Sequence, residues 1–425
     1  MKLAGRLLLL LLLAVSGRSR VRLATSLLGL TDGFGSLLPK LSRPANHSRI
    51  FYAVMFDAGS TGTRVHVYTF IQKQLPILDN EMFHSIKPGL SAYADSPETV
   101  SSLTLLKVAK KTVPRLEWKR CPLVLRATAG LRLLAEDKAQ VLLQQVQHVF
   151  DESPFLVPDD SVGVMNGTYE GNVWPLKLFS GHLSAQTKNT VGILDLGGGS
   201  TQITFLPNQR KTIESVPAAD YVARFGISNT SFELYTYSYL GNGLMAARLA
   251  TLGALGAEGT GWRVFRSSCL PKKFKGEWSF GELTYRVSGD PEGFAGYKLC
   301  YQEVLKAVKG IIHQPYKLED SNVFYAFSYY FDRAVDAGLI DGDHGGMLQV
   351  RDFKKRAKEV CNEMSKSTPT SAFLCMDMTY ITCLLKDGFG FKESTVLKLT
   401  KKVNNVEASW ALGAVLDHFH NLKIH

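Results

Sequence analysis

Two glycine-rich segments constrain the fold more than any other feature of this sequence. The first is 57–64 (DAGSTGTR) and the second is 195–202 (DLGGGSTQ). Each follows an apolar run with strand character and is followed by alternating β-forming residues, so both are predicted to be hairpins with glycine at the tip. The two segments begin 138 residues apart (195 minus 57). Their shared pattern predicts a duplicated domain whose two halves face each other across one ligand.

Loops of this composition suit a phosphate group. Glycine has no Cβ to block the approach of backbone N–H groups to an anion, and the neighbouring Ser and Thr residues add hydroxyl donors. An Asp at the end of the incoming strand, here Asp57 and Asp195, is well placed to hold a divalent cation directly or through its waters. Either loop alone is equally typical of a plain glycine-rich hairpin. The repetition of the pattern favours the phosphate interpretation.

The N-terminus has the composition of a secretory signal. Lys2 and Arg6 precede the apolar run 7–15, and Ala14 and Ser16 at its end are small residues at the two positions that a signal peptidase reads. This run is too short for a bilayer, which needs about twenty apolar residues. The alternative is an uncleaved anchor, with the arginines at 18, 20 and 22 as a stop signal. We expect residues 1–16 to be a signal peptide, 17–47 a tail, and the protein to enter the endoplasmic reticulum lumen, be secreted, or both, with no stable membrane span.

The net charge of +11 does not indicate a nucleic-acid partner. Residues 1–50 hold eight Lys or Arg and one Asp, which is +7 and leaves +4 for the remaining 375 residues. The body of the chain has no basic stripe with interleaved aromatic residues, which nucleic-acid binding surfaces commonly show. We therefore expect no nucleic-acid partner, and nothing in the sequence sets an oligomeric state.

The cysteine pattern predicts sparse disulfides. None of the six cysteines forms a Cys-x-x-Cys motif, so disulfide bonds in a secreted protein are favoured over a metal cluster. The spacing predicts one bond between Cys269 and Cys300 and another between Cys361 and Cys375, while the remaining two cysteines lie in apolar runs. Two Asn-x-Ser/Thr sequons, at Asn46 and Asn229, lie in polar segments suited to a glycan.

Five short blocks together resemble a known enzyme family. They stand in the order DAGSTGTR (57–64), ATAGLR (127–132), NGTYEG (166–171), DLGGGSTQ (195–202) and YSYLGNG (237–243). This ordered set resembles the signature regions of the ectonucleoside triphosphate diphosphohydrolases, the apyrase-like ectonucleotidases. The stretches KPGLSAY (87–93) and LLKDGFGF (384–391) are most similar to the type-five branch, which are soluble nucleoside diphosphatases of the endoplasmic reticulum.

The resemblance implies the fold as well as the activity. It predicts an α/β fold of two ribonuclease H-like domains, as in the actin, Hsp70 and hexokinase superfamily, with an interdomain cleft. Domain I would comprise 48–164 and 404–425, and domain II would comprise 165–403. The implied reaction is the hydrolysis of UDP and GDP to the monophosphate and phosphate. Two alternatives remain, a broad apyrase that takes ATP and ADP, and an Hsp70-like or actin-like nucleotide-gated binding protein.

The resemblance also implies the roles of individual residues. Glu170 would be the base, with Ser200 and Gln202 positioning the attacking water. The residues implied to hold Ca²⁺ or Mg²⁺ through its waters are Asp57, Asp195, Thr128 and Trp410. The residues implied to bind phosphate are Gly59, Ser60, Thr61, Gly62, Thr63, Arg64, Ala129, Gly197, Gly198, Gly199 and Thr201.

Several of these assignments have plain structural alternatives. Glu170 also suits a helix N-terminus, Arg64 a surface ion pair, and Trp410 a hydrophobic core. The residues expected to stack on the nucleobase are Tyr325, Tyr329 and Tyr330, although core strand residues would look the same. Relatives commonly carry an acidic residue immediately before the base, where this chain has tyrosine.

Overall fold

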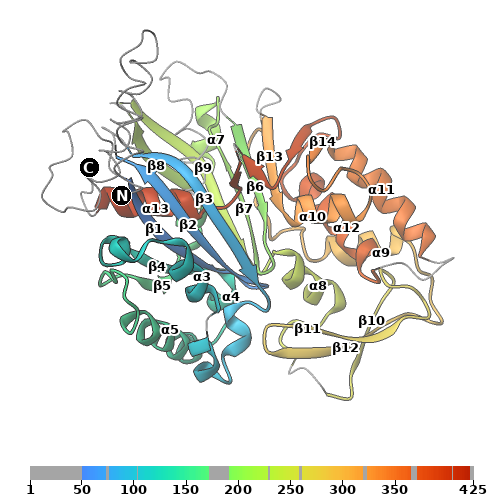
Figure 1. The fold of residues 1–425 in the computed structure, drawn as a ribbon. Coiled ribbons are helices and arrows are strands. Elements are labelled where there is room, and N and C mark those ends of the chain that lie inside the picture. Colours follow the sequence, from blue (N-terminus) through green and yellow to red (C-terminus); the bar gives the residue numbers. More distant parts are fainter. Residues whose placement is uncertain are drawn as a thin grey trace, which may run out of the picture. The chain divides into compact units, whose positions relative to one another are not determined.

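The computed structural model describes residues 50–72, 76–102, 104–171, 191–227, 230–257, 261–318, 323–364, 371–403 and 405–421. Residues 51–425 form one compact unit (Figure 1). The expected signal peptide, the tail and the two glycan sites Asn46 and Asn229 lie outside the described residues. No described helix has the length and apolar character needed to cross a membrane.

A five-stranded sheet comes first along the chain. Its order is β3-β2-β1-β4-β5. The strands are β1 (Ile50–Ala58), β2 (Thr63–Ile71), β3 (Ile77–Ile86), β4 (Leu123–Ala127) and β5 (Val162–Val164). β1, β4 and β5 run parallel, and β3 is antiparallel to β2. The hairpin expected around the first glycine-rich segment is therefore present, because β1 and β2 are neighbours.

A seven-stranded sheet repeats this arrangement around the second glycine-rich segment. Its order is β14-β15-β13-β6-β7-β9-β8. The strands are β6 (Val191–Leu196), β7 (Ser200–Phe205), β8 (Val222–Ile227), β9 (Thr230–Leu240), β13 (Val323–Ser328), β14 (Gly346–Gln349) and β15 (Val396–Leu399). The inner order β9-β7-β6-β13-β15 matches that of the first sheet, with β6, β13 and β15 parallel and β7 antiparallel to β9. The predicted duplication of two ribonuclease H-like sheets is thereby confirmed.

The duplication places the two aspartates equivalently. Asp57 is the penultimate residue of β1, and Asp195 is the penultimate residue of β6. Each of these strands is central in its sheet, with a parallel neighbour on one side and a hairpin partner on the other. Both strands are almost fully buried near their ends, which explains why their sequences are continuous apolar runs rather than alternating ones.

Helices cover the sheets and complete the cores. The helices are α3 (Thr104–Thr112), α4 (Ala129–Arg132), α5 (Glu136–Asp151), α7 (Arg210–Glu214), α8 (Leu244–Leu252), α9 (Tyr297–Leu305), α10 (Tyr329–Asp336), α11 (Val350–Glu363), α12 (Leu374–Cys383) and α13 (Ala411–Asn421). In α5 the buried residues include Ala139, Leu142, Val146 and Val149, the three-to-four-residue spacing of an amphipathic helix. Separate apolar clusters fill the helix side of each sheet.

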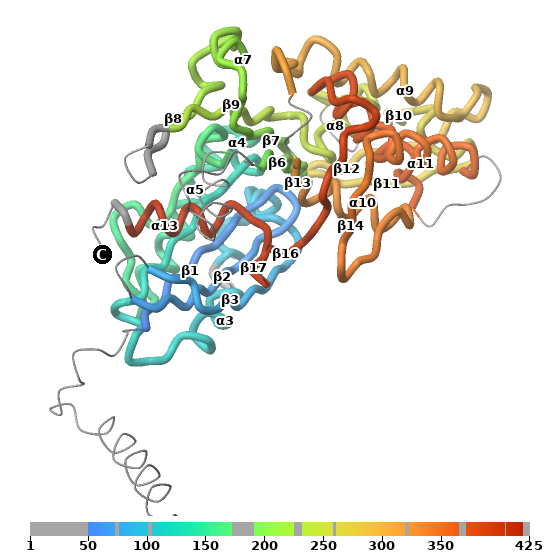
Figure 2. The backbone as a smooth tube through the Cα atoms, turned by 90° about the horizontal axis from the view of Figure 1, so that it is seen from above, coloured from blue at the N-terminus to red at the C-terminus, as the bar shows by residue number. Residues whose placement is uncertain are grey.

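The C-terminal helix returns to the first sheet. After β15 the chain forms two short strands, β16 (Lys402–Val403) and β17 (Val406–Glu407), and then α13. Phe419 of α13 packs edge-on against Phe51 and Phe70, with ring centroids 5.4 and 5.2 Å apart. Figure 2 shows α13 beside β1 and β2. This packing agrees with the expected return of the chain, while the domain boundaries themselves stay a prediction.

The segment between the first disulfide-bonded cysteines forms part of a small third sheet. Its strands are β10 (Val264–Ser267), β11 (Lys275–Phe280) and β12 (Leu283–Gly289), in the order β10-β12-β11. Both predicted disulfides are present, Cys269–Cys300 and Cys361–Cys375. Cys121 is a free, buried thiol, as is Cys383.

Candidate active site

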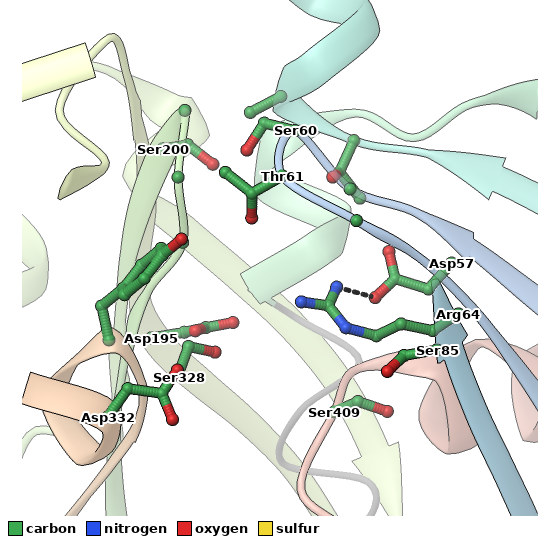
Figure 3. A pocket seen from close by; sticks show the side chains of 18 of the residues that line it. Asp57, Ser60, Thr61, Arg64, Ser85, Asp195, Ser200, Ser328, Asp332 and Ser409 are labelled. Atoms are coloured by element: carbon green, nitrogen blue, oxygen red, sulfur yellow. Dashed lines mark hydrogen bonds and ion pairs between the residues drawn. The ribbon is translucent and has the colours of Figure 1, made fainter. Parts of the chain in front are cut away.

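One cavity of about 710 Å³ lies where the two glycine-rich segments meet. Residues of both sheets line it, including Asp57 from β1 and Asp195 from β6. Figure 3 shows Asp57 and Arg64 on one wall, with Asp195, Ser328 and Asp332 on the other. The equivalent strands β1 and β6 therefore each contribute an aspartate to the same cavity.

The first glycine-rich loop is fixed by close backbone packing. It turns tightly, with the Gly59 N–H donating to the carbonyl of Gly62 at 3.0 Å. A Cβ built on Gly89 would lie 2.3 Å from the Gly59 carbonyl oxygen, and one on Gly130 would lie 2.9 Å from Cα of Ser60. Real Cβ atoms do not approach backbone this closely, so only glycine fits at these two positions.

The second loop is held by the start of α8 and faces the first loop directly. The N–H of Leu244 donates to the Gly197 carbonyl at 2.8 Å, and that of Ala246 donates to the Gly198 carbonyl at 3.1 Å. A Cβ on Gly198 would lie 2.5 Å from Oγ of Ser60. The two loops thus come within contact distance across the cavity, as a clamp around one phosphate chain requires.

Two carboxylate oxygens in the cavity are buried without a protein partner. Arg64 donates to Oδ2 of Asp57 at 2.8 Å, while Oδ1 of Asp57 and Oδ1 of Asp195 have no hydrogen-bond partner. Burial raises the pKa of Asp195 to about 6, and hydrogen bonding from Ser328 and the charge of Arg64 oppose this rise. An unpartnered buried carboxylate oxygen is costly. A hydrated divalent cation would satisfy both oxygens, so the donor set fits such an ion.

Glu170 lies in the helical turn after β5, paired with an arginine that the sequence-based reasoning did not assign. Nη2 of Arg132 is 2.5 Å from Oε2 of Glu170 and 3.5 Å from Oγ of Ser200. Burial raises the pKa of Glu170 to about 8, although the charge of Arg132 lowers it and that of Asp195 raises it. Arg132 is the last residue of the ATAGLR block. Its membership of that block was the only feature of the sequence that pointed to a place in the site.

The turn that carries Glu170 is anchored to the C-terminal helix. The hydroxyl of Tyr169 donates a short hydrogen bond to Asp417 of α13. Asp417 lies 248 residues further along the sequence than Tyr169, so sequence spacing could not reveal this contact.

Gln202 lies beside Ser200, and its predicted contact with the attacking water stays a prediction. It is 1% exposed and is not among the lining residues. Its amide nitrogen donates to Oγ of Ser200 and to Oγ of Ser238, each at 2.8 Å. Ser200 does line the cavity, so Gln202 orients a residue at the site.

The predicted contacts of the Thr201 and Thr63 side chains with phosphate are not present in the structure. Thr201 is fully buried, and its hydroxyl donates to the backbone carbonyl of Asp195 at 2.8 Å. Thr63 is 2% exposed. Neither lines the cavity, because the alternation of side chains along β7 and β2 turns them into the protein. The other residues expected to bind phosphate do line it, namely Gly59, Ser60, Thr61, Gly62, Arg64, Ala129, Gly197, Gly198 and Gly199.

Fewer of the tyrosines expected to stack on the nucleobase line the cavity than the sequence predicted. Tyr329 lines the cavity, as do Thr128 and Trp410. Tyr330 is fully buried in the core, so the prediction that it stacks on a base is wrong. Tyr325 is also outside the lining, and its hydroxyl accepts a hydrogen bond from Lys398 at 3.1 Å. The buried aromatic residues of β13 are Phe324 and Phe327, while Tyr325 is half-buried.

Sequence comparison identifies close relatives of the chain. It is 56% identical over 399 residues to ectonucleoside triphosphate diphosphohydrolase 5 of Gallus gallus, covering 92% of this chain and 93% of that protein. It is 55% identical to nucleoside diphosphate phosphatase ENTPD5 of Homo sapiens, covering 88% of each chain. Ectonucleoside triphosphate diphosphohydrolase 6 of Homo sapiens is 48% identical, over 90% of this chain and 80% of that protein.

A solved structure shares the fold. The crystal structure of nucleoside triphosphate hydrolases from Neospora caninum superposes with a TM-score of 0.61 at 13% sequence identity, covering 96% of this chain and 98% of that chain. The GDA1/CD39 (nucleoside phosphatase) family matches residues 43–425, nearly the whole sequence. With this match and relatives above half identity, the chain belongs to the GDA1/CD39 nucleoside phosphatase family.

Proposed function

We propose that this protein is a nucleoside diphosphatase that hydrolyses UDP and GDP to the monophosphate and inorganic phosphate. The observation that carries the proposal is the convergence in a single cavity of two glycine-rich loops, two aspartates that each have one unpartnered oxygen, and the buried carboxylate of Glu170. The name of the human relative, nucleoside diphosphate phosphatase, supports diphosphates as substrates.

The protein must perform three tasks to catalyse this reaction. The phosphate charge must be neutralised, a water must be aligned with the terminal phosphorus, and that water must lose a proton. Backbone N–H groups of the two loops, with the hydroxyls of Ser60 and Thr61, suit the first task. A divalent cation, when bound through its waters by Asp57 and Asp195, would add to this neutralisation.

Glu170 suits the proton transfer. The water oxygen attacks the terminal phosphorus, the bond from that phosphorus to the bridging oxygen breaks, and the water proton passes to Glu170. Burial keeps the pKa of this carboxyl near 8, and a base whose pKa lies near the working pH is effective. Arg132 holds the carboxylate and also reaches Ser200. Ser200, which accepts a hydrogen bond from Gln202, would hold the attacking water.

A nucleotide panel tests the proposal. We expect the full-length protein to release phosphate from UDP and GDP in the presence of Ca²⁺ or Mg²⁺, and to lose this activity in a chelator. Turnover of ATP and ADP at rates equal to those of UDP and GDP would instead establish a broad apyrase. Tight nucleotide retention with about one turnover per molecule would establish a nucleotide-gated binding protein.

We further propose that the protein works in the endoplasmic reticulum lumen or after secretion. Two disulfides among buried cysteines support an oxidising compartment, and the composition of residues 1–16 supports entry into it. N-terminal sequencing of the protein from the lumen and from the medium would identify the cleavage site. Recovery of an uncleaved protein from the cytosol would contradict the proposal.

A further inference from the structure

Glu170 lies in the first turn of a helix, where the backbone has little support of its own. The helical residues begin at 167, directly after Asn166. Oδ1 of Asn166 accepts the N–H of Thr168 at 2.8 Å, and its carbonyl accepts the N–H of Glu170 at 3.0 Å. The end of a helix is the part most prone to fray. The direction of the Glu170 side chain therefore depends on contacts with other elements.

Two contacts from different elements hold this turn. Arg132 of α4 pairs with the Glu170 carboxylate at 2.5 Å, and Asp417 of α13 accepts the hydrogen bond from the Tyr169 hydroxyl. Neighbouring residues of a helix point about 100° apart, so the two contacts restrain the turn from two directions. Arg132 restrains the end of the Glu170 side chain, whereas Asp417 restrains the backbone that carries it.

The segment that holds Tyr169 is itself fixed to the first sheet. Before α13 begins, the N–H of Glu407 donates to Oε2 of Glu81 at 2.5 Å. Oε1 of the same carboxylate is 2.8 Å from Nδ1 of His66, and the side chains of Glu81 and His66 are almost completely buried. At the far end of α13, Phe419 packs against aromatic rings of β1 and β2. Asp417 therefore belongs to an element that is held at both ends.

The same segment of chain reaches the cavity. Ser409 and Trp410 line the cavity, and α13 begins at the next residue. Asp417 follows Trp410 by seven residues (417 minus 410), which is about 10 Å along a helix. The Tyr169 ring packs against the apolar cluster that contains Trp410. The C-terminal segment therefore contacts both the cavity and the turn that carries Glu170.

The Tyr169 hydroxyl remains a hydrogen-bond donor near neutral pH. Burial raises the pKa of this hydroxyl above its ordinary value, and the hydrogen bond to Asp417 raises it further, while the charge of Arg126 lowers it. A carboxylate acceptor makes such a bond stronger than one between neutral groups. Neither Tyr169 nor Asp417 is among the groups that shift the pKa of Glu170. Their effect on Glu170 is therefore on its position rather than on its charge.

We propose that Tyr169 and Asp417 are positioning residues for the proposed hydrolysis, because their hydrogen bond fixes the turn of Glu170 to α13 and keeps the carboxylate aligned with the attacking water. This inference rests on the proposed nucleoside diphosphatase function. The two glycine-rich loops line the cavity, whereas Tyr169 and Asp417 are not among its lining residues. Loss of the hydrogen bond should therefore slow the chemical step and leave nucleotide binding by the loops intact.

Tyr169→Phe tests the proposal, because it removes the hydroxyl and keeps the packing of the ring. We expect kcat for UDP to fall at least about tenfold, since misplacing a reacting group by about 1 Å can cost about a hundredfold. KM should stay within about twofold of the wild-type value, as should the affinity for UMP in calorimetry. A wild-type kcat, or an unchanged kcat with a raised KM, would overturn the inference.

Tyr301→Phe is the matched control. Tyr301 of α9 donates a comparable hydrogen bond to Asp387, and neither of these residues is among those that line the cavity. This variant should keep the wild-type kcat and KM. If it lowered kcat as much as Tyr169→Phe does, the loss would reflect general destabilisation, and the positioning role would be overturned.

Substitutions of Asp417 examine the other end of the hydrogen bond. Asp417→Asn keeps a side-chain oxygen as acceptor and should retain most of the wild-type kcat, whereas Asp417→Ala should lose as much as Tyr169→Phe. Because both residues act through one bond, the Tyr169→Phe/Asp417→Ala protein should lose no more kcat than either single variant. Losses that multiply in the double variant, or equal losses in Asp417→Asn and Asp417→Ala, would overturn the inference.

The remaining outcomes separate this inference from the proposed function. If circular dichroism shows that Tyr169→Phe does not fold, the two Asp417 variants decide the question. Full kcat in Tyr169→Phe together with loss of kcat in Glu170→Gln would overturn the positioning role and leave the diphosphatase function standing. Failure of the wild-type protein to hydrolyse any nucleoside diphosphate would overturn the proposed function itself, and with it this inference.

Discussion

The chemistry of Glu170 depends on a balance between burial and one ion pair. Burial disfavours the charged carboxylate and raises its pKa, while Arg132 favours the charged form and lowers it. Burial prevails, because the pKa stays at about 8. Arg132 is therefore a positioning residue that contacts both Glu170 and Ser200 and limits how far the pKa of Glu170 rises.

Replacing Arg132 should move the pH profile. Protonated Glu170 cannot accept a proton from water, so kcat/KM falls as the pH drops through the pKa of Glu170. Arg132→Met removes the group that lowers this pKa, and the acid limb of kcat/KM should therefore shift to higher pH. Arg132→Lys retains a cation and should shift it less. A limb that stays in place, or moves to lower pH, in Arg132→Met would contradict this account.

At the scale of elements, glycine contacts set the position of the first phosphate loop. Gly89 and Gly130 lie against the backbone of Gly59 and Ser60 at distances that leave no room for a side chain. The loop position is thus determined by two other segments of the chain, one before η1 (Leu90–Tyr93) and one within α4. A glycine elsewhere in the same sheet, Gly163 of β5, has no such neighbour within 4 Å.

Gly89→Ala should impair the site more than the fold. The added methyl group must displace the Gly59 carbonyl, and a shift of the phosphate loop by a few tenths of an ångström misaligns several donors at once. We expect at least about a tenfold loss of kcat/KM for UDP, with native circular dichroism. Gly163→Ala is the matched control and should retain wild-type kinetics. Equal kinetics in the two variants would contradict the proposed fixing of the loop.

The sequence predicted these elements where the signal was local. Both glycine hairpins, the carboxylates at the strand ends and the two disulfides follow from residue type and spacing, and the structure has them. Tyr330 and Thr201 were misplaced because motif membership does not say which way a strand or helix turns a side chain. The partners of Glu170 and Tyr169 were missed because they are joined only by folding, across 38 and 248 residues.

For the whole molecule, the cavity takes its walls from both duplicated sheets. The first sheet supplies Asp57 and the second supplies Asp195, so a nucleotide with its cation would contact both halves at once. The sequence predicted this symmetry from the repeated loop. It did not predict that Arg248 and Arg333 both bond to the buried Asp377, because these residues carry no motif and meet only through the packing of α8, α10 and α12.

Ligand binding should therefore stabilise the entire unit. The Glu170→Gln protein, which we expect to bind UDP without hydrolysing it, should unfold at a higher temperature when UDP and Mg²⁺ are both present. At a ligand concentration of 100 times Kd, the stabilisation should be about 2.7 kcal/mol. Scanning calorimetry with and without a chelator measures it. An unfolding temperature unaffected by UDP and Mg²⁺ would contradict a site that joins the two sheets.

The central claim, that Glu170 accepts the proton of the attacking water, is tested most directly by phosphate release from UDP. Glu170→Gln keeps the size of the side chain and removes the base, so kcat should fall by a factor of about 10² to 10⁴. Glu152→Gln is the matched control, because Glu152 is 70% exposed beside His148, and it should keep wild-type kcat. A folded Glu170→Gln protein that releases phosphate at the wild-type rate would contradict the claim.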